Sequence, residues 1–89
     1  MNYHYPIDLS WSTEETIVVV EFLALIEKAY QGSVARQALL DQYQEFKKVI
    51  PSKSEEKTIG NAFEKTSGFS LYRTIQKARN EETKRISMK

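Results

Sequence analysis

Two short pairings of a hydroxyl with a glutamate constrain the fold of this chain more than any other feature. Ser12 lies three residues before Glu15, and Ser52 lies three residues before Glu55. At a helix start the hydroxyl accepts a hydrogen bond from a free backbone amide, and the glutamate can bond back to the cap residue. Three residues that typically end helices follow at intervals, namely Gly32, Pro51 and Gly68. The sequence therefore predicts four helical segments.

The spacing of apolar residues defines the boundaries of these segments more precisely. In the first they recur at helical intervals, at Val19, Leu23, Ile26 and Tyr30, which is typical of a helix at the centre of its domain. The run Ile17–Val20 also favours a strand, but the length of the segment and its cap outweigh that signal. The predicted helices span 13–30, ending in a left-handed turn at Gly32; 34–49, capped by Ser33; 53–66; and a fourth that starts after Ser70.

The predicted fold class is all-α, a single compact domain over residues 1–89 with about four helices. A chain of this length has room for one core, which buries roughly 60–65% of the unfolded surface. Residues 1–11 are rich in aromatic side chains, and we expect them to lie across the helices as an extended arm, or to bind a partner. Residues 80–89 are mostly polar, so we expect a frayed tail.

Charge is balanced overall but unevenly distributed. The net charge of +1 argues against a generic polyanion binder. Residues 1–45 carry two cations against seven acids, a net charge of −5, whereas residues 46–89 carry eleven cations against five acids, or +6. This division suits acidic helices that pack against basic ones, and it equally suits a basic face that meets an anionic partner.

The residues available for chemistry are few. The chain has no cysteine, which excludes disulfides, thiolate metal sites and cysteine nucleophiles. The lone histidine, His4, has Asp8 and Ser10 nearby in sequence, but no spacing selects a metal site or a catalytic triad. Adjacent glutamates, as at Glu14 and Glu15, point about 100° apart on a helix and do not form an acid/base couple. We therefore expect no enzyme, no catalytic residue, no cofactor and no metal.

Binding is the better hypothesis. We expect a non-enzymatic module that binds another protein, in the cytoplasm and away from membranes, because the longest apolar run is too short to span a bilayer and no charged leader precedes it. Its oligomeric state stays open. The candidate interaction surface consists of residue types favoured at interfaces: Tyr3, His4, Tyr5, Tyr72, Arg73 and Lys77.

Two alternatives also stay open. The first is nucleic-acid binding through the basic half, with Arg73, Lys77 and Lys84 near one face of the fourth helix. The second is a small enzyme or anion-ligand binder at the Ser70 and Arg73 corner, which would need a concave pocket that brings these residues near His4 or a carboxylate.

Three strings of residues carry a family resemblance. They are NYHYPID at 2–8 followed by Trp11, YQEFKKVIPSK at 43–53, and GFS at 68–70 followed by Tyr72 and Arg73. With them the chain resembles the YktA-like family of small uncharacterised proteins from low-GC Gram-positive bacteria, over nearly its whole length. The resemblance implies a compact all-helical cytoplasmic protein. It implies no substrate, cofactor or catalytic residue.

Overall fold

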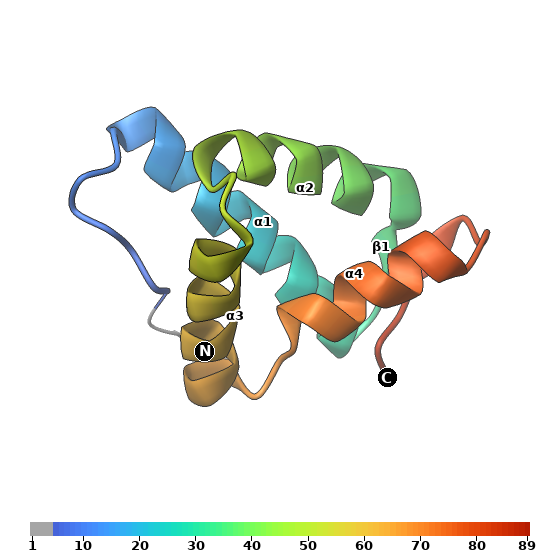
Figure 1. Cartoon of the computed structure of the whole chain (residues 1–89). Coiled ribbons are helices and arrows are strands. Elements are labelled where there is room, and N and C mark those ends of the chain that lie inside the picture. The colour runs from blue at the N-terminus through green and yellow to red at the C-terminus, as the bar shows by residue number, and fades with distance from the viewer. Residues whose placement is uncertain (1–4) are drawn as a thin grey trace.

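The computed structural model describes residues 5–89 and folds them into four helices and two very short strands (Figure 1). In chain order the elements are α1 (Thr13–Gln31), β1 (Val34–Ala35), α2 (Arg36–Val49), α3 (Lys53–Ser67), α4 (Leu71–Asn80) and β2 (Arg85–Ile86). The radius of gyration is 12.2 Å, close to the value of about 12 Å expected of one compact domain of this length. The predicted all-α fold class is confirmed. Tyr3 and His4 lie outside the described residues.

Helix α1 begins at the predicted capping box. The Ser12 hydroxyl accepts from the Glu15 amide at 3.1 Å, and the Glu15 carboxylate accepts from the Ser12 amide at 2.8 Å. The branched run Ile17–Val20 lies within the helix, so the competing strand signal was misleading. The helix ends at Gly32 as expected, but with φ −164° and ψ −105°, which lies outside the left-handed region. The left-handed turn is instead at Gly68, φ 81°, which ends α3.

Helix α1 lies at the centre of the domain, as its apolar stripe predicts. Val19, Leu23 and Ile26 are fully buried, together with Phe22 and Ala29. The most extensive helix–helix interface joins α1 to α2, and α4 packs across both of these helices. Helix α3 contacts α4 and stands at the side of the bundle (Figure 1). The burial of three phenylalanine rings, at Phe22, Phe46 and Phe63, supplies much of the core.

The second helix starts two residues later than predicted, because the chain first forms a strand. Val34 pairs with Ile86 and Ala35 with Arg85 in an antiparallel ladder. The helix cap is Ala35, which makes no side-chain bond, so the prediction of Ser33 as the cap was wrong. The Ser33 hydroxyl instead accepts from Arg85 Nε at 2.8 Å. Burial of Val34 against the tail outweighs a hydroxyl cap here.

The tail is docked on the domain, which differs from the predicted fraying of residues 80–89. Ile86 is 0% exposed, and Met88 packs against the core. The Met88 amide donates to the Ala29 carbonyl at 2.8 Å, and Lys77 Nζ donates to the Ser87 carbonyl at 2.6 Å. Two apolar residues in a polar stretch, together with these hydrogen bonds, therefore anchor the tail on the domain.

The described part of the aromatic arm, residues 5–11, runs from α3 round to the start of α1 (Figure 1). The Tyr5 ring stacks on Phe63 of α3 with centroids 6.1 Å apart, and its hydroxyl bonds to Glu27 of α1. Trp11 packs against the core. Between them Leu9 is 98% exposed. The two aromatic ends of this segment therefore hold it against the helices.

Candidate functional site

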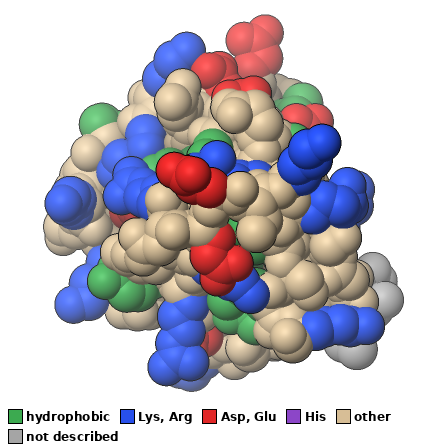
Figure 2. All heavy atoms as spheres, turned by 90° about the vertical axis from the view of Figure 1, so that its right-hand side faces the viewer, with side chains coloured by type: hydrophobic (Ala, Val, Ile, Leu, Met, Phe, Trp, Pro, Cys, Tyr) green, Lys and Arg blue, Asp and Glu red, His purple; other side chains and the backbone are tan. Residues whose placement is uncertain are grey.

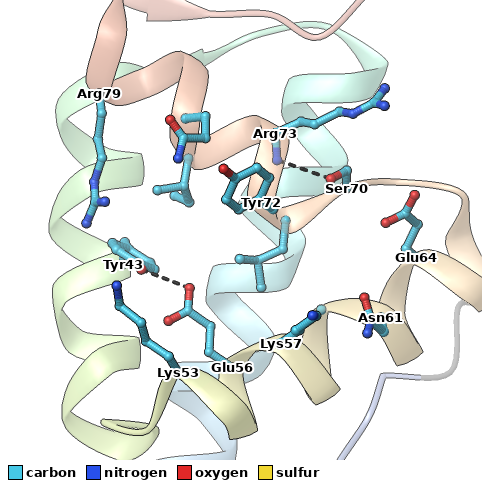
Figure 3. A pocket seen from close by; sticks show the side chains of 14 residues that line it. Tyr43, Lys53, Glu56, Lys57, Asn61, Glu64, Ser70, Tyr72, Arg73 and Arg79 are labelled. Carbon is cyan, nitrogen blue, oxygen red and sulfur yellow. Dashed lines mark hydrogen bonds between the residues drawn. The ribbon is translucent and has the colours of Figure 1, made fainter.

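One groove, of about 650 Å³, lies between α3 and α4 and reaches the side of α2 (Figure 3). Its apolar lining includes Tyr43, Leu71 and Ile75. At Gly60 of α3, a Cβ would lie 3.6 Å from the Leu71 Cβ, an ordinary van der Waals distance. A longer side chain at position 60 would therefore extend into the groove. The sequence shows Gly60 only as a weak point of a helix, whereas the structure shows that it leaves space beside Leu71.

Tyr43 links the three helices around this groove. Its hydroxyl donates to Glu56 Oε2 of α3 at 2.8 Å, and Arg79 of α4 lies over its ring with Cζ 5.3 Å from the centroid. Lys47 Nζ donates to the other oxygen of Glu56 at 2.6 Å. Burial, with the hydrogen bond and charge of Glu56, raises the pKa of Tyr43 to about 12. The hydroxyl is therefore protonated at neutral pH and acts as a structural donor.

Four cations line the groove, two from α3 and two from α4: Lys53, Lys57, Arg73 and Arg79. The two ion pairs within residues 5–89 join Lys47 to Glu56 and Lys48 to Glu45. None of the four groove cations has a carboxylate within ion-pair distance in this part of the chain. Because no described carboxylate pairs with them, these cations are available to an anionic ligand.

Acidic groups are fewer in the groove and are placed differently. Glu56 is bonded to both Tyr43 and Lys47, so its charge is already compensated. Glu64 lies at the far end of α3, beyond Asn61 (Figure 3). Lys53 and Arg79 extend toward Tyr43 from opposite sides in the same view. The end of the groove near Tyr43 is therefore the more positive one.

Two of the predicted interaction residues lie in this groove. Tyr72 is 70% exposed and Arg73 is exposed beside it, both in the first turn of α4. Tyr5 is half-buried through its contacts with Phe63 and Glu27, and Lys77 is half-buried and bonded to the tail. Neither of these two lines the groove. Tyr3 and His4 stand outside the described residues, so the predicted surface is brought together only at Tyr72 and Arg73.

Sequence reasoning missed the α3 side of the groove. Positions 53, 57, 60, 61 and 64 follow one another at intervals of four, three, one and three, which places them on one helical face. This periodicity was a usable signal, but it describes a polar face, and polar faces are common on surface helices. What distinguishes this one is its position opposite α4.

At the corner formed by Ser70 and Arg73, Ser70 makes hydrogen bonds that hold the start of α4 in place. The Ser70 hydroxyl accepts from the Arg73 amide at 3.1 Å as the cap of α4, and the Ser70 amide donates to the Tyr30 hydroxyl at 3.1 Å. The groove does place this corner in the same cavity as two carboxylates, Glu56 and Glu64. Over residues 5–89, no three His, Cys, Asp or Glu side chains lie close enough together to hold a metal ion.

The basic face predicted for nucleic acid is not formed as expected. Helix α4 ends at Asn80, so Lys84 lies beyond it and cannot share its face. Lys77 is bonded to the Ser87 carbonyl. Figure 2 shows the side of the molecule that lies at the right of Figure 1, and lysine and arginine side chains are spread over it with acidic side chains among them. A continuous basic track is the usual footprint of a polyanion, and this side does not present one.

Among residues 5–89 no helix is both long enough and apolar enough to cross a membrane. The described structure is thus that of a small helical domain with a cation-lined groove between two of its helices. The model of an uncharacterised protein family, UPF0223, matches residues 2–87, and the chain belongs to this family.

Relatives from Gram-positive bacteria match almost end to end. A UPF0223 protein of Streptococcus gordonii is 56% identical over 87 residues, covering 98% of this chain and 95% of the relative. One from Bacillus pumilus is 51% identical over 86 residues, covering 97% of each. One from Streptococcus pneumoniae is 52% identical, covering 97% of this chain and 94% of the relative. The predicted family is therefore confirmed, and its description assigns no enzymatic activity and no function.

Proposed function

We propose that this protein is a non-enzymatic module that binds another protein through the groove between α3 and α4. The observation that carries the proposal is the exposure of Tyr72 next to Arg73 and to apolar residues that line the groove. A tyrosine that is 70% exposed lies beside Arg73 and above an apolar lining. Tyrosine and arginine are the residues most enriched at the energetic centres of protein interfaces.

Three polar side chains of the groove make structural contacts, which supports binding rather than catalysis by these groups. Tyr43 and Glu56 bond to one another, and Ser70 caps α4, so these groups hold the helices in place. A general acid or base must reach a substrate proton, and these side chains are already occupied. We take the cytoplasm as the compartment, and a chain without cysteine is compatible with a reducing environment.

Site-specific cross-linking tests this proposal. Tyr72 would be replaced by the photoreactive p-benzoylphenylalanine in the full-length protein, produced in the bacterium that encodes it. The matched control places the same group at Ala62, an exposed position of α3 that does not line the groove. We expect irradiation to give one discrete protein adduct from position 72 and none from position 62.

The captured protein would then be purified and titrated against the unmodified domain. We expect direct binding that Tyr72→Ala weakens by roughly tenfold or more, as for an interface hot spot. The same adducts from both positions, or an adduct with nucleic acid in place of protein, would overturn the proposal.

A further inference from the structure

We propose that the partner presents an acidic peptide segment to this groove, with an apolar or aromatic side chain among its carboxylates. This inference rests on the proposed function and adds the chemistry of the ligand. It follows from the charges on the groove, from the surface around Tyr72 and from the spacing of the acidic groups.

Charge is the first argument. Lys53 and Lys57 are four residues apart on α3, where like charges repel one another. Arg79 faces the same end of the groove from α4 and is already stacked on Tyr43, which orients its guanidinium (Figure 3). No described carboxylate lies within ion-pair distance of these three cations. A carboxylate that enters between Lys53 and Arg79 would relieve the repulsion and could form charge-assisted hydrogen bonds with both side chains.

The surface around Tyr72 gives the second argument. The Tyr72 ring is 70% exposed beside the buried Leu71, and the space left at Gly60 adjoins Leu71 from the other helix. An apolar side chain lying against this ring would bury more surface than a polar one. The groove volume of about 650 Å³ falls in the range of known ligand sites, about 300–1,000 Å³. It therefore has room for several side chains of a peptide.

The spacing of acidic groups argues for a peptide rather than a nucleic acid. Glu64 and Glu56 interrupt the cations along α3, and Asn61 lies between them. A phosphate backbone carries a charge at every nucleotide and would meet Glu64. A peptide can place a neutral residue there, and the Asn61 amide can both donate to and accept from a peptide backbone.

A random peptide library displayed on phage, selected against the immobilised full-length protein, tests this inference. We expect the enriched peptides to carry several Asp or Glu residues around one Leu, Phe, Tyr or Trp. The strongest of them, made synthetically with a fluorescent label, becomes the probe for anisotropy titrations at fixed salt.

Two pairs of variants locate the site. Lys53→Gln with Arg79→Gln should weaken binding of the probe roughly tenfold. Lys65→Gln with Lys84→Gln removes the same charge from exposed positions outside the groove and should change affinity less than twofold. Since Arg79 also contacts Tyr43, a third pair, Lys53→Gln with Lys57→Gln, removes charge from the α3 side of the groove without touching that contact and should also weaken binding of the probe. Circular dichroism would show that each variant is folded.

The outcomes separate this inference from the proposed function. No enrichment, enrichment of neutral or basic peptides, or equal losses in the groove and control pairs would overturn the acidic ligand. So would a random single-stranded RNA oligonucleotide that binds more tightly than the probe and depends on the same groove cations. The cross-link from position 72 to a protein could still be found in the first three cases, and the proposed function would then survive with a different ligand.

Discussion

One side chain, Tyr43 of α2, contacts each of the other three helices. Tyr43 donates to Glu56, supports Arg79 on its ring and lies 5.5 Å from Phe22 between ring centroids. A sequence predicts that such a tyrosine is buried, because it falls on the apolar face of its helix. It does not predict the partners, because Glu56 and Arg79 come from segments whose placement depends on the whole fold.

Removing one oxygen from Tyr43 should destabilise the domain. We expect Tyr43→Phe to lower the free energy of unfolding by about 1–2 kcal/mol, since a hydrogen bond to a charged acceptor is lost and Glu56 loses one of its two donors. Urea unfolding followed by circular dichroism measures this. Tyr72→Phe is the matched control, and its effect should stay within about 0.5 kcal/mol because the side chain is exposed. Equal effects of the two changes would contradict the role of Tyr43.

The same residue should make stability depend on alkaline pH. The pKa of Tyr43 is about 12 in the folded protein and about 10 in an unfolded chain. The folded state therefore keeps its proton longer, and the stabilisation is complete below pH 10 and is lost as pH rises toward 12. We expect the difference in unfolding free energy between wild type and Tyr43→Phe to shrink over that interval. A difference that stays constant from pH 9 to pH 12 would contradict the raised pKa.

Among the elements, the helices were predictable and the strands were not. Capping residues and apolar periodicity are local, so they placed four helices within a few residues of their ends. Strands β1 and β2 have two residues each, which is too short to show any alternation. Their pairing joins the residues before α2 to the residues after α4, and no sequence pattern near Ser33 or Ile86 indicates it. The groove could not be predicted for the same reason, since Lys53 and Arg79 line one groove only once α3 and α4 have packed together.

The tail is the element whose role is most easily tested. Ile86→Ala should lower the free energy of unfolding by about 2–4 kcal/mol, because it empties a fully buried site. The exposed neighbour Lys84→Ala should cost no more than about 0.5 kcal/mol. Chemical denaturation measures both changes, and amide exchange at Met88 gives an independent readout of docking. If the tail were frayed as its composition suggests, the two substitutions would have the same small effect.

At the scale of the whole molecule, the ion pairs found within residues 5–89 neutralise little of the uneven charge of the chain. Residues 1–45 carry a net charge of −5 and residues 46–89 carry +6. Of the two ion pairs within residues 5–89, only the one between Lys47 and Glu56 joins different helices. The packing of the acidic α1 against α2 and α4 therefore does not rest on close ion pairs between these helices among the described residues.

The arm, bundle and tail should also unfold together. Trp11, the only tryptophan, packs against the core, as do Tyr5 and Met88 near the two ends of the described chain. We expect tryptophan fluorescence and far-ultraviolet circular dichroism to report the same midpoint in urea, as for a two-state domain. A fluorescence transition at clearly lower urea than the loss of helix would show that the arm detaches first.

The pairing of β1 with β2 also bears on the helices around the groove. All three helices that border the groove lie between residues 34 and 86, where the two strands meet. The strand pair thus joins, through backbone hydrogen bonds, the two ends of the chain segment that carries α2, α3 and α4. This pairing keeps the start of α2 close to the chain that follows α4, because β1 runs directly into α2 and β2 follows α4. Two residues of each strand therefore help to fix the positions of two helices that border the groove.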